Sequence, residues 1–268
     1  MEKNILLTIQ YDGSAFHGWQ AQPGVRTAQG CLEEALGRVL GTTIAIRGTS
    51  RTDAGVHALG QRASFITDSG IPTDRIPRAV NGGLTKGRTG MGSQIGDLIV
   101  LAAEEREAAF HARFDAVGKT YVYVMDTGKA NVFFRNYRYF VSSPLDKDAM
   151  GEAASLLVGR HDFRSFKAAG DEAVRTTERT IYRCRIEQRG HLLYLVITGD
   201  GFLYNMVRII AGTLAEVGAG KRKAASIRDI LAARDRAAAG HTAPPGGLYL
   251  KEIYFSDQEL HDAISRRP

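Results

Sequence analysis

The antiparallel character of the fold is decided by residues 180–198, which read TIYRCRIEQRGHLLYLVIT. The segments 180–188 and 192–198 carry the apolar and β-branched residues typical of strands. Between them, Arg189-Gly190 is typical of a tight turn. This stretch therefore predicts a β-hairpin, whose two strands run antiparallel.

Outward from this hairpin, short strands alternate with helices along the whole chain. Strands are predicted at residues 5–11, 44–47, 62–67, 97–103, 119–126, 137–141 and 248–255. Helices are predicted at residues 28–39, 74–80, 146–158, 203–217 and 226–238, with Thr27 and Ser226 as N-caps. Few of the connections read as βαβ crossovers, so the fold class is α+β with a largely antiparallel sheet. The polar tail from Ser256 is expected to be peripheral.

The chain length favours two domains. At roughly 150 residues per domain, 268 residues make about two. Both halves mix helices with hairpin-joined strands, which predicts an N-terminal half over residues 1–108 and a C-terminal half over residues 109–268. A cleft between two such halves is a common place for a ligand site.

Composition excludes several classes of protein. Apolar residues make up 44% and charged residues 24%, an ordinary balance for a soluble globular protein. No apolar run reaches about 18 residues, so no membrane span is expected. The first residues, MEKNILLTIQYDG, lack the features of a secretory signal. Two cysteines, Cys31 and Cys184, exclude a disulfide scaffold and suggest no zinc site, so a cytoplasmic location is expected.

The charge balance favours a polyanionic partner without proving one. Thirty-five Lys and Arg residues against 29 Asp and Glu give a net charge of +6 and a pI of about 9.4. Basic residues interleave with aromatic ones at 133–139 and 160–167, and a basic run lies at 221–223. Residues 82–96 are Gly-rich and basic and predict a mobile loop, but they lack the order of a phosphate-binding P-loop. Each stretch alone fits a solvated surface, whereas together they favour contact with a nucleic-acid backbone.

The most unusual stretch for chemistry is GTSRTDAGVHA, residues 48–58. Asp53 is a candidate nucleophile or general base, because a carboxylate is charged at neutral pH without activation. Arg51, two residues away, can pair with Asp53 and lower its pKa. The pattern alone favours a plainer alternative, an Asp that caps a turn beside a surface Arg. His57 is more consistent with a structural histidine than with an acid, a base or a metal ligand.

Two further residues have both a functional and a plain interpretation. Tyr121 follows Lys119, and an aromatic ring beside a cation can stack on a nucleobase and hold a phosphate; it can equally be a core aromatic of a half-buried strand. Arg208 shares one helix face with Asn205 and Gly212. That face is by default solvated, but if it lines a cleft, Arg208 can bind a carboxylate or phosphate through two nitrogens.

Five stretches of the sequence occur in the order found in a known family. They are YDGSAFHGWQAQP (11–23), GTSRTDAGVHALGQ (48–61), FHARFDAVGKTYVY (110–123), FLYNMVRIIAGTL (202–214) and GLYL (247–250). In these motifs the chain resembles the TruA family of tRNA pseudouridine synthases, over nearly its whole length. The resemblance implies two α+β halves around a continuous, mostly antiparallel sheet, with the active site in the central cleft. It also implies a cytoplasmic homodimer that isomerises uridine to pseudouridine at positions 38, 39 and 40 of the tRNA anticodon stem-loop, without a metal or organic cofactor.

The resemblance implies roles for four residues. Asp53 matches the catalytic aspartate, and Tyr121 matches the tyrosine that packs on the target base. Arg51 matches the arginine associated with base flipping and with pairing the carboxylate. Arg208 matches an arginine expected close to Asp53.

One stretch departs from the family pattern, and the chemical course stays open. Thr85 replaces a proline, and a longer Gly-rich run precedes Asp97, which leaves the tRNA contacts and the set of target positions open. Asp53 can attack C1′, attack the ring, or abstract a 2′ proton to give a glycal. Two other functions are an RNA-binding protein of the same fold and a nucleoside hydrolase or glycosidase. A retaining glycosidase requires a second carboxylate about 5 Å away.

Overall fold

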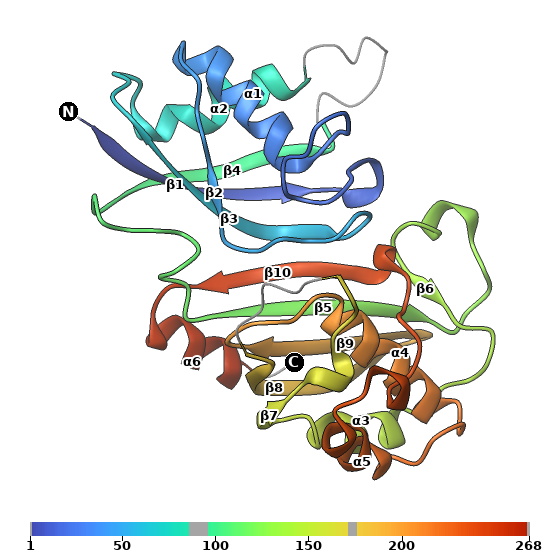
Figure 1. Ribbon diagram of the computed structural model, residues 1–268. Coiled ribbons are helices and arrows are strands. Elements are labelled where there is room, and N and C mark those ends of the chain that lie inside the picture. The colour runs from blue at the N-terminus through green and yellow to red at the C-terminus, as the bar shows by residue number, and fades with distance from the viewer. Residues whose placement is uncertain (1, 86–95, 171–175, 267–268) are drawn as a thin grey trace. The chain divides into compact units, whose positions relative to one another are not determined.

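The structure is a computed structural model that describes residues 2–85, 96–170 and 176–266. The chain divides into two compact units. The first comprises Met1–Ala116 and Leu250–Phe255, and the second comprises Val117–Tyr249 and Ser256–Pro268. Each unit combines antiparallel strands with helices (Figure 1), so the predicted α+β class with mostly antiparallel pairing is confirmed.

The first unit is built on strands β1 (Lys3–Tyr11), β3 (His57–Thr67) and β4 (Leu98–Arg106). β1 lies between the other two and pairs antiparallel with both, so that Leu7 faces Ala63 on one side and Ala103 on the other. The short β2 (Arg47–Gly48) pairs with β3, and β10 (Leu248–Tyr254) follows β3 in the strand order. The expected strand at 44–47 is therefore wrong except at its last residue.

Two helices cover this group of strands. α1 (Ala28–Leu40) and α2 (Ile76–Thr85) lie side by side, and α2 packs on β4 (Figure 1). Thr27 caps α1 as predicted, because its side chain accepts a hydrogen bond from Gly30 N. Leu32 and Leu36 of α1 are fully buried and belong to the core.

The second unit has the strand order β5 (Gly118–Asp126), β9 (Leu192–Gly199), β8 (Glu178–Arg189), β7 (Gly159–Asp162). Each neighbouring pair in this order is antiparallel, and β8 and β9 form the hairpin predicted from residues 180–198. The short β6 (Tyr139–Phe140) pairs parallel with β5. The short 3₁₀ turns among the described residues are Gly13–Ala15, Thr73–Arg75, Val132–Phe134, Arg164–Phe166, Arg236–Ala238 and Pro245–Gly247.

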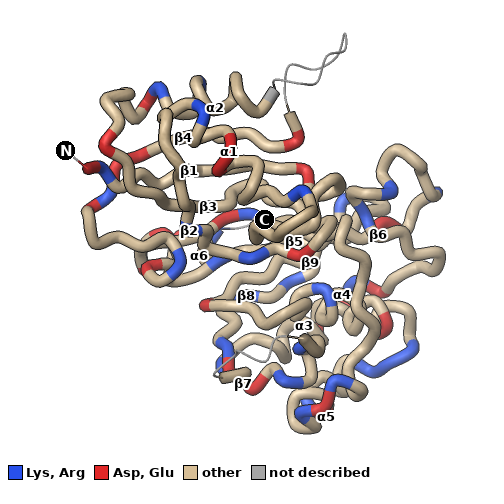
Figure 2. Tube along the Cα trace, turned by 45° about the horizontal axis from the view of Figure 1, so that its top comes forward, with Lys and Arg blue, Asp and Glu red and all other residues tan. Residues whose placement is uncertain are grey.

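Helices α3 (Lys147–Ser155) and α4 (Met206–Gly218) pack against each other, and also on β8 and β5 respectively. α5 (Ser226–Ala233) ends well before the predicted residue 238, because Arg234 adopts a left-handed conformation with a φ of 51°. The predicted cap at Ser226 is also wrong, since Ser226 is the first helical residue and its hydroxyl donates to Lys223 O. The basic run 221–223 joins α4 to α5 (Figure 2).

The polar tail contains a helix that the sequence pattern did not predict. α6 (Asp257–Ser265) begins at the N-cap Ser256 and buries Leu260 and Ala263. Arg183 of β8 donates to Ala263 O at 3.0 Å, which fastens the helix to the strand. The tail is therefore packed rather than peripheral.

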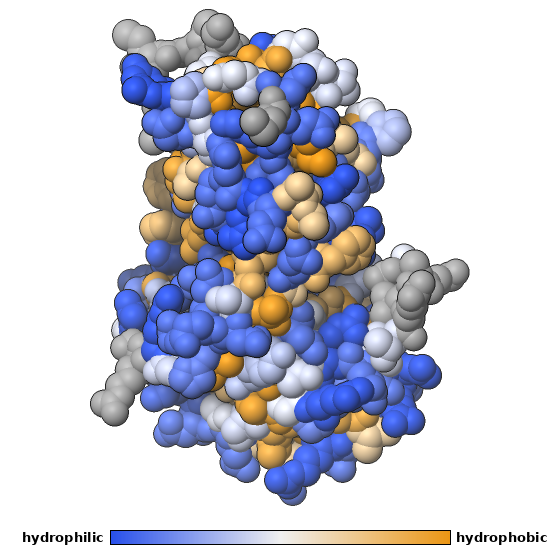
Figure 3. Space-filling view, turned by 90° about the vertical axis from the view of Figure 1, so that its left-hand side faces the viewer, coloured by the Kyte–Doolittle hydropathy of each residue, from blue (hydrophilic) through white to orange (hydrophobic). Residues whose placement is uncertain are grey.

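The stretches predicted to be basic surface differ from one another. Residues 82–85 complete α2, so the loop prediction is wrong for them, and residues 86–95 lie outside the described residues. Phe163 and Phe166 are fully buried, so the aromatic residues of 160–167 belong to the core. Phe133, by contrast, is 79% exposed. On the face that Figure 3 shows, apolar surface occurs as separate patches among polar residues.

Candidate active site

The loop that carries Asp53 connects β2 to β3, and β3 fixes its first residues. Thr49 N donates to Arg62 O at 2.9 Å, and the Thr49 hydroxyl donates to Ala112 O at 2.9 Å. The next residue, Ser50, is held by the fully buried side chain of Gln61: its Nε2 donates to Ser50 O at 2.6 Å, and its Oε1 accepts from Ser50 N at 3.3 Å. The Gln61 side chain of β3 therefore pairs with the main-chain N–H and C=O of Ser50, as a neighbouring strand would do.

The N-terminal motif at 11–23 supports the same loop from another side. The Tyr11 hydroxyl lies 2.7 Å from Thr52 Oγ1, and Trp19 N donates to Thr52 O at 3.0 Å. The rings of Tyr11 and Trp19 stack, with centroids 6.0 Å apart. At Gly18, whose φ is +86°, an added Cβ would lie 2.7 Å from Thr52 O, so only glycine allows this approach. These contacts fix the main chain immediately before Asp53.

Within the loop the three candidate residues differ in exposure. Asp53 is half-buried and its carbonyl accepts from Val56 N at 3.1 Å. Arg51 is exposed, and its ion pair with Asp53 stays a prediction. His57 is 2% exposed, and its Nδ1 accepts from Gly13 N at 3.0 Å. The same Nδ1 lies 3.2 Å from Asp12 Oδ1, so the His57 side chain ties the loop to the 11–23 motif, in agreement with the structural interpretation.

An ion pair at the start of β4 was missed by the sequence reasoning. Nη1 and Nη2 of Arg26 donate to the two carboxylate oxygens of Asp97, at 2.7 and 2.8 Å, and Asp12 N donates to Asp97 O at 2.8 Å. The hydrogen bond to Asp97 raises the pKa of Arg26. The Arg26 guanidinium also lies 4.2 Å from the ring centroid of Phe16. The 11–23 motif is thereby tied to the residue that follows the Gly-rich stretch.

In the second unit, Tyr121 lies on β5 and is 6% exposed. Its ring meets the ring of Phe202 edge-on, with centroids 5.2 Å apart and an interplanar angle of 87°. Phe202 belongs to the connection between β9 and α4. Both interpretations of Tyr121 agree with this packing, since a buried ring can present one face to a ligand.

Arg208 lies in the first turn of α4 and is held by two acceptors. Its Nη1 donates to Asn205 Oδ1 at 2.6 Å, and its Nε donates to Ala243 O at 2.8 Å. Asn205 has a φ of 58°, a conformation that Asn tolerates better than most residues. The expectation of a solvated face is wrong at Gly212, where an added Cβ would lie 2.0 Å from His241 O. The chain itself covers this part of the helix.

The four predicted residues thus fall in two groups. Asp53 and Arg51 share one loop of the first unit, whereas Tyr121 and Arg208 both adjoin the β9–α4 connection of the second. In the part of the chain that the structure describes, no group of three His, Cys, Asp or Glu residues could hold a metal ion. None of the described helices is long and apolar enough to cross a membrane.

Comparison with known proteins identifies the family. The model of a family described as tRNA pseudouridine synthase matches residues 7–115 and 153–256. The chain belongs to the tRNA pseudouridine synthase family. The predicted resemblance is therefore confirmed, and the chain is an isomerase of the pseudouridine synthase class.

Relatives cover almost the whole synthase. A protein named tRNA pseudouridine synthase A from Caldicellulosiruptor bescii is 44% identical over 94% of this chain and 100% of its own length. One of the same name from Syntrophomonas wolfei is 46% identical over 94% of this chain and 98% of its own length. One from Brevibacillus brevis is 47% identical over 94% of this chain and its whole length. The family match includes Asp53, Arg51 and Arg208, whereas Tyr121 lies between its two segments. The expected role of Tyr121 therefore rests on its motif alone, and its packing agrees with that role.

Proposed function

We propose that this synthase isomerises uridine to pseudouridine at positions 38, 39 and 40 in the anticodon stem-loop of tRNAs. The observation that carries the proposal is the Asp53 loop: a half-buried carboxylate on a main chain fixed by Gln61, Tyr11 and Trp19. The reaction breaks the bond between C1′ and N1 and joins C5 to C1′, with loss of the C5 proton. It makes no net redox change, so a well-placed carboxylate and a held base are what it requires.

Asp53 is the proposed catalytic residue. A carboxylate is charged at neutral pH and needs no separate base to become a nucleophile. The fixed loop holds the carboxylate's main chain before substrate arrives, and such preorganisation lowers the cost of reaching the reactive geometry. Attack on C1′, attack on the ring and abstraction of the 2′ proton are all open to a carboxylate in this position.

The other three residues have proposed roles in binding the substrate. Arg51 is exposed and therefore available to enter the RNA as the target base leaves its stack, a step that costs a few kcal/mol. Tyr121, whose ring is braced by Phe202, packs on the target base. Arg208, held by Asn205 and Ala243, is proposed to stabilise negative charge during the reaction.

The proposed substrate also explains the charge of the chain. A net charge of +6 favours binding to the phosphate backbone of tRNA.

We propose that the synthase is a cytoplasmic homodimer whose subunits together form the tRNA-binding surface, and that it uses no metal or organic cofactor. Light scattering of the purified protein with and without tRNA measures the oligomeric state, and a monomer in both would contradict it.

The test is tritium release from unmodified tRNA labelled at C5 of uridine. Joining C5 to C1′ expels the C5 proton, so tritium release reports the reaction itself. Wild type and Asp68→Asn, an exposed acid of the same unit, should release tritium, whereas Asp53→Asn and Asp53→Ala should bind tRNA without release. Transcripts with a single uridine at 38, 39 or 40 identify the target positions.

The same assay separates the alternatives. Turnover retained by a clean Asp53→Ala preparation would refute the role of Asp53. Binding without release by any variant would indicate an RNA-binding protein, and free uracil would indicate a hydrolase.

A further inference from the structure

A short segment between α5 and β10 runs directly over α4 in the second unit. We call residues 239–244 the strap. Gly240 N donates to Thr213 Oγ1 at 2.9 Å, and Ala243 N donates to Arg208 O at 3.1 Å. The Tyr123 hydroxyl of β5 donates to Pro244 O at 2.7 Å. The strap is therefore fastened along its length rather than at one end.

The strap follows a single stripe of α4. Arg208, Gly212 and Glu216 are spaced by four residues, so their positions lie on one helix face. In the strap, Ala243 contacts Arg208, and His241 contacts both Gly212 and Glu216. Because Gly212 has no Cβ, the strap lies against the helix backbone itself. The strap therefore connects Glu216 at one end of this stripe to Arg208 at the other.

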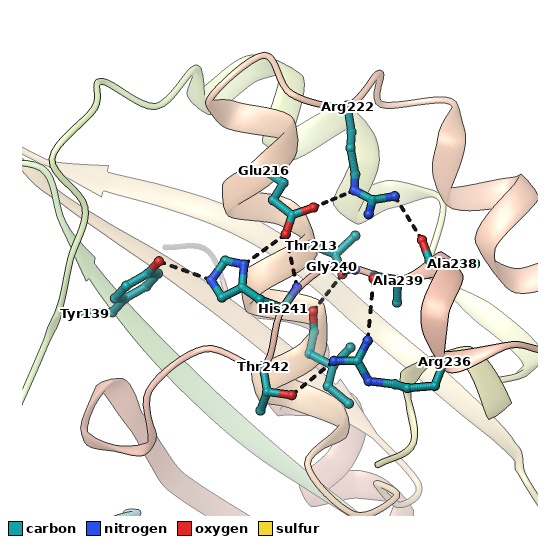
Figure 4. Close-up of polar contacts among 11 residues, drawn as sticks. Tyr139, Thr213, Glu216, Arg222, Arg236, Ala238, Ala239, Gly240, His241 and Thr242 are labelled. Atoms are coloured by element: carbon teal, nitrogen blue, oxygen red, sulfur yellow. Dashed lines mark hydrogen bonds and ion pairs between the residues drawn. The ribbon is translucent and has the colours of Figure 1, made fainter. Parts of the chain in front are cut away.

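Glu216 is the anchor at the far end of the stripe (Figure 4). Its Oε1 accepts from His241 N at 3.0 Å and lies 2.9 Å from His241 Nδ1, and its Oε2 accepts from Arg222 Nε at 2.5 Å. Arg222 also donates to Ala238 O at 2.9 Å, just before the strap, and the Tyr139 hydroxyl lies 3.1 Å from His241 Nε2. Both oxygens of the carboxylate are therefore occupied by groups that hold the strap.

The carboxylate is well suited to this position because it accepts hydrogen bonds at both oxygens. Partial burial alone would raise the pKa of Glu216, but the hydrogen bonds from His241 and Arg222 outweigh it and lower the pKa to about 2. Glu216 is therefore ionised at every pH at which the protein is expected to work. A glutamine of the same size has one acceptor and one donor, so it cannot accept from both partners.

We propose that Glu216 is a positioning residue for Arg208, acting through the strap. Glu216 accepts a hydrogen bond from His241 N. Ala243 follows two residues later in the strap, and its carbonyl oxygen accepts from Nε of Arg208 at 2.8 Å. The inference rests on the proposed function, which gives Arg208 its role in the reaction. It assigns Glu216 no contact with the substrate.

A double-mutant cycle in the full-length protein tests the proposal. Single-turnover tritium release is measured for wild type, Glu216→Ala, Arg208→Ala and the double variant, with steady-state kcat and KM for the single variants. Glu216→Ala should lower the rate at least about tenfold, because small displacements of positioned groups have effects of this size. Its KM should change less than about threefold, as for an interaction made in the transition state. On the Arg208→Ala background the further loss should be under about twofold.

Three controls keep the result interpretable. Glu178→Gln removes an exposed glutamate that pairs with Arg160 at 2.7 Å in the same unit, and it should leave the rate unchanged. Glu216→Gln, which keeps the side-chain volume, should give an intermediate loss and replaces Glu216→Ala in the cycle if that variant does not fold. Thermal unfolding of each variant establishes that it is folded at the assay temperature.

The possible outcomes separate this inference from the proposed function. Equal losses on both backgrounds, no loss in Glu216→Ala, or no loss in Arg208→Ala would each overturn the positioning role while wild-type release and the Asp53→Asn defect persist. Failure of the proposed function would instead appear as no release by wild type.

Discussion

Replacing Gln61 with leucine tests whether β3 holds the Asp53 loop in place. Leucine has a similar volume, so the change removes hydrogen bonds with little change in packing. The lost bonds are Gln61 Nε2 to Ser50 O at 2.6 Å, and those that Oε1 accepts from Ser50 N at 3.3 Å and Arg62 N at 3.2 Å. All three are removed at a position where the Gln61 side chain is fully buried.

The expected loss is large because the partners are main-chain groups in the interior. A typical net hydrogen bond contributes about 0.5–1.5 kcal/mol, and a buried group that loses its partner costs about 1–3 kcal/mol. Three such bonds, two of them longer than 3.0 Å and therefore weaker, give about 2–4 kcal/mol. That is a substantial part of the roughly 5–15 kcal/mol by which a typical native protein is stable. Because the loop loses its attachment at Ser50, kcat should also fall at least about tenfold.

Urea unfolding and tritium release measure the two effects in the same preparation of Gln61→Leu. Gln188→Leu is the matched control, because Gln188 is exposed and its Nε2 donates to Gly190 O within the same turn, at 3.0 Å. That variant should lose less than about 0.5 kcal/mol and keep full activity. A loss below about 1 kcal/mol in Gln61→Leu, or a normal kcat, would refute the reasoning that Gln61 positions the loop.

Four further predictions follow from described contacts. Asp97→Asn should lower stability by only about 0.5–1 kcal/mol, because Arg26 is partly exposed, and a fall of a few degrees in Tm measures it. The pKa of Glu216 is lowered to about 2, so the ionised side chain stabilises the fold above the ordinary glutamate pKa, and this contribution is lost as the pH falls toward 2. Glu216→Gln should remove this part of the acid dependence of stability, measured by denaturant titrations from pH 5 to 2. Phe133→Ala removes an aromatic ring that is 79% exposed in the basic and aromatic stretch 133–139, and it should weaken tRNA binding by about fivefold to a hundredfold in filter binding if the ring stacks on a base. Gly212→Ala should destabilise by about 1–2 kcal/mol in thermal unfolding, because the clash at 2.0 Å outweighs the roughly 1 kcal/mol of helix propensity that alanine adds.

The parts of the fold that could be predicted are those coded locally. The β8–β9 hairpin is visible in its apolar and β-branched residues and its Arg189-Gly190 turn, and α1 is visible in its helical period and its cap at Thr27. The end of α5 is different, because nothing in the local pattern announces a left-handed Arg234. The burial of Phe163 and Phe166 likewise depends on packing against distant segments, which a basic and aromatic composition does not reveal.

The candidate site divides in the same way. Asp53 stands out from its own neighbours in the sequence, whereas the residues that hold its loop are ordinary in theirs: Tyr11 is one of several alternating strand residues, and Gln61 is one polar residue of β3. Glu216 was missed because an acid on a helix face normally indicates solvent, and its partner His241 lies 25 residues away. The available signal was the four-residue spacing of Arg208, Gly212 and Glu216.

The two groups of site residues are held by the same physical device. In each, a glycine lets a main chain approach so closely that a side chain would not fit: Gly18 beneath Thr52 O, and Gly212 beneath His241 O. In each, a side chain with several hydrogen-bonding atoms then fixes the approaching segment, Gln61 at Ser50 and Glu216 at His241. The isomerisation adds and removes no atoms apart from the exchange of a proton. Its rate therefore depends on how the reacting groups are oriented, and orientation can lower an activation barrier by up to about 7–11 kcal/mol. Residues that never meet the substrate are therefore expected to matter for the rate, because they limit the motion of those that do.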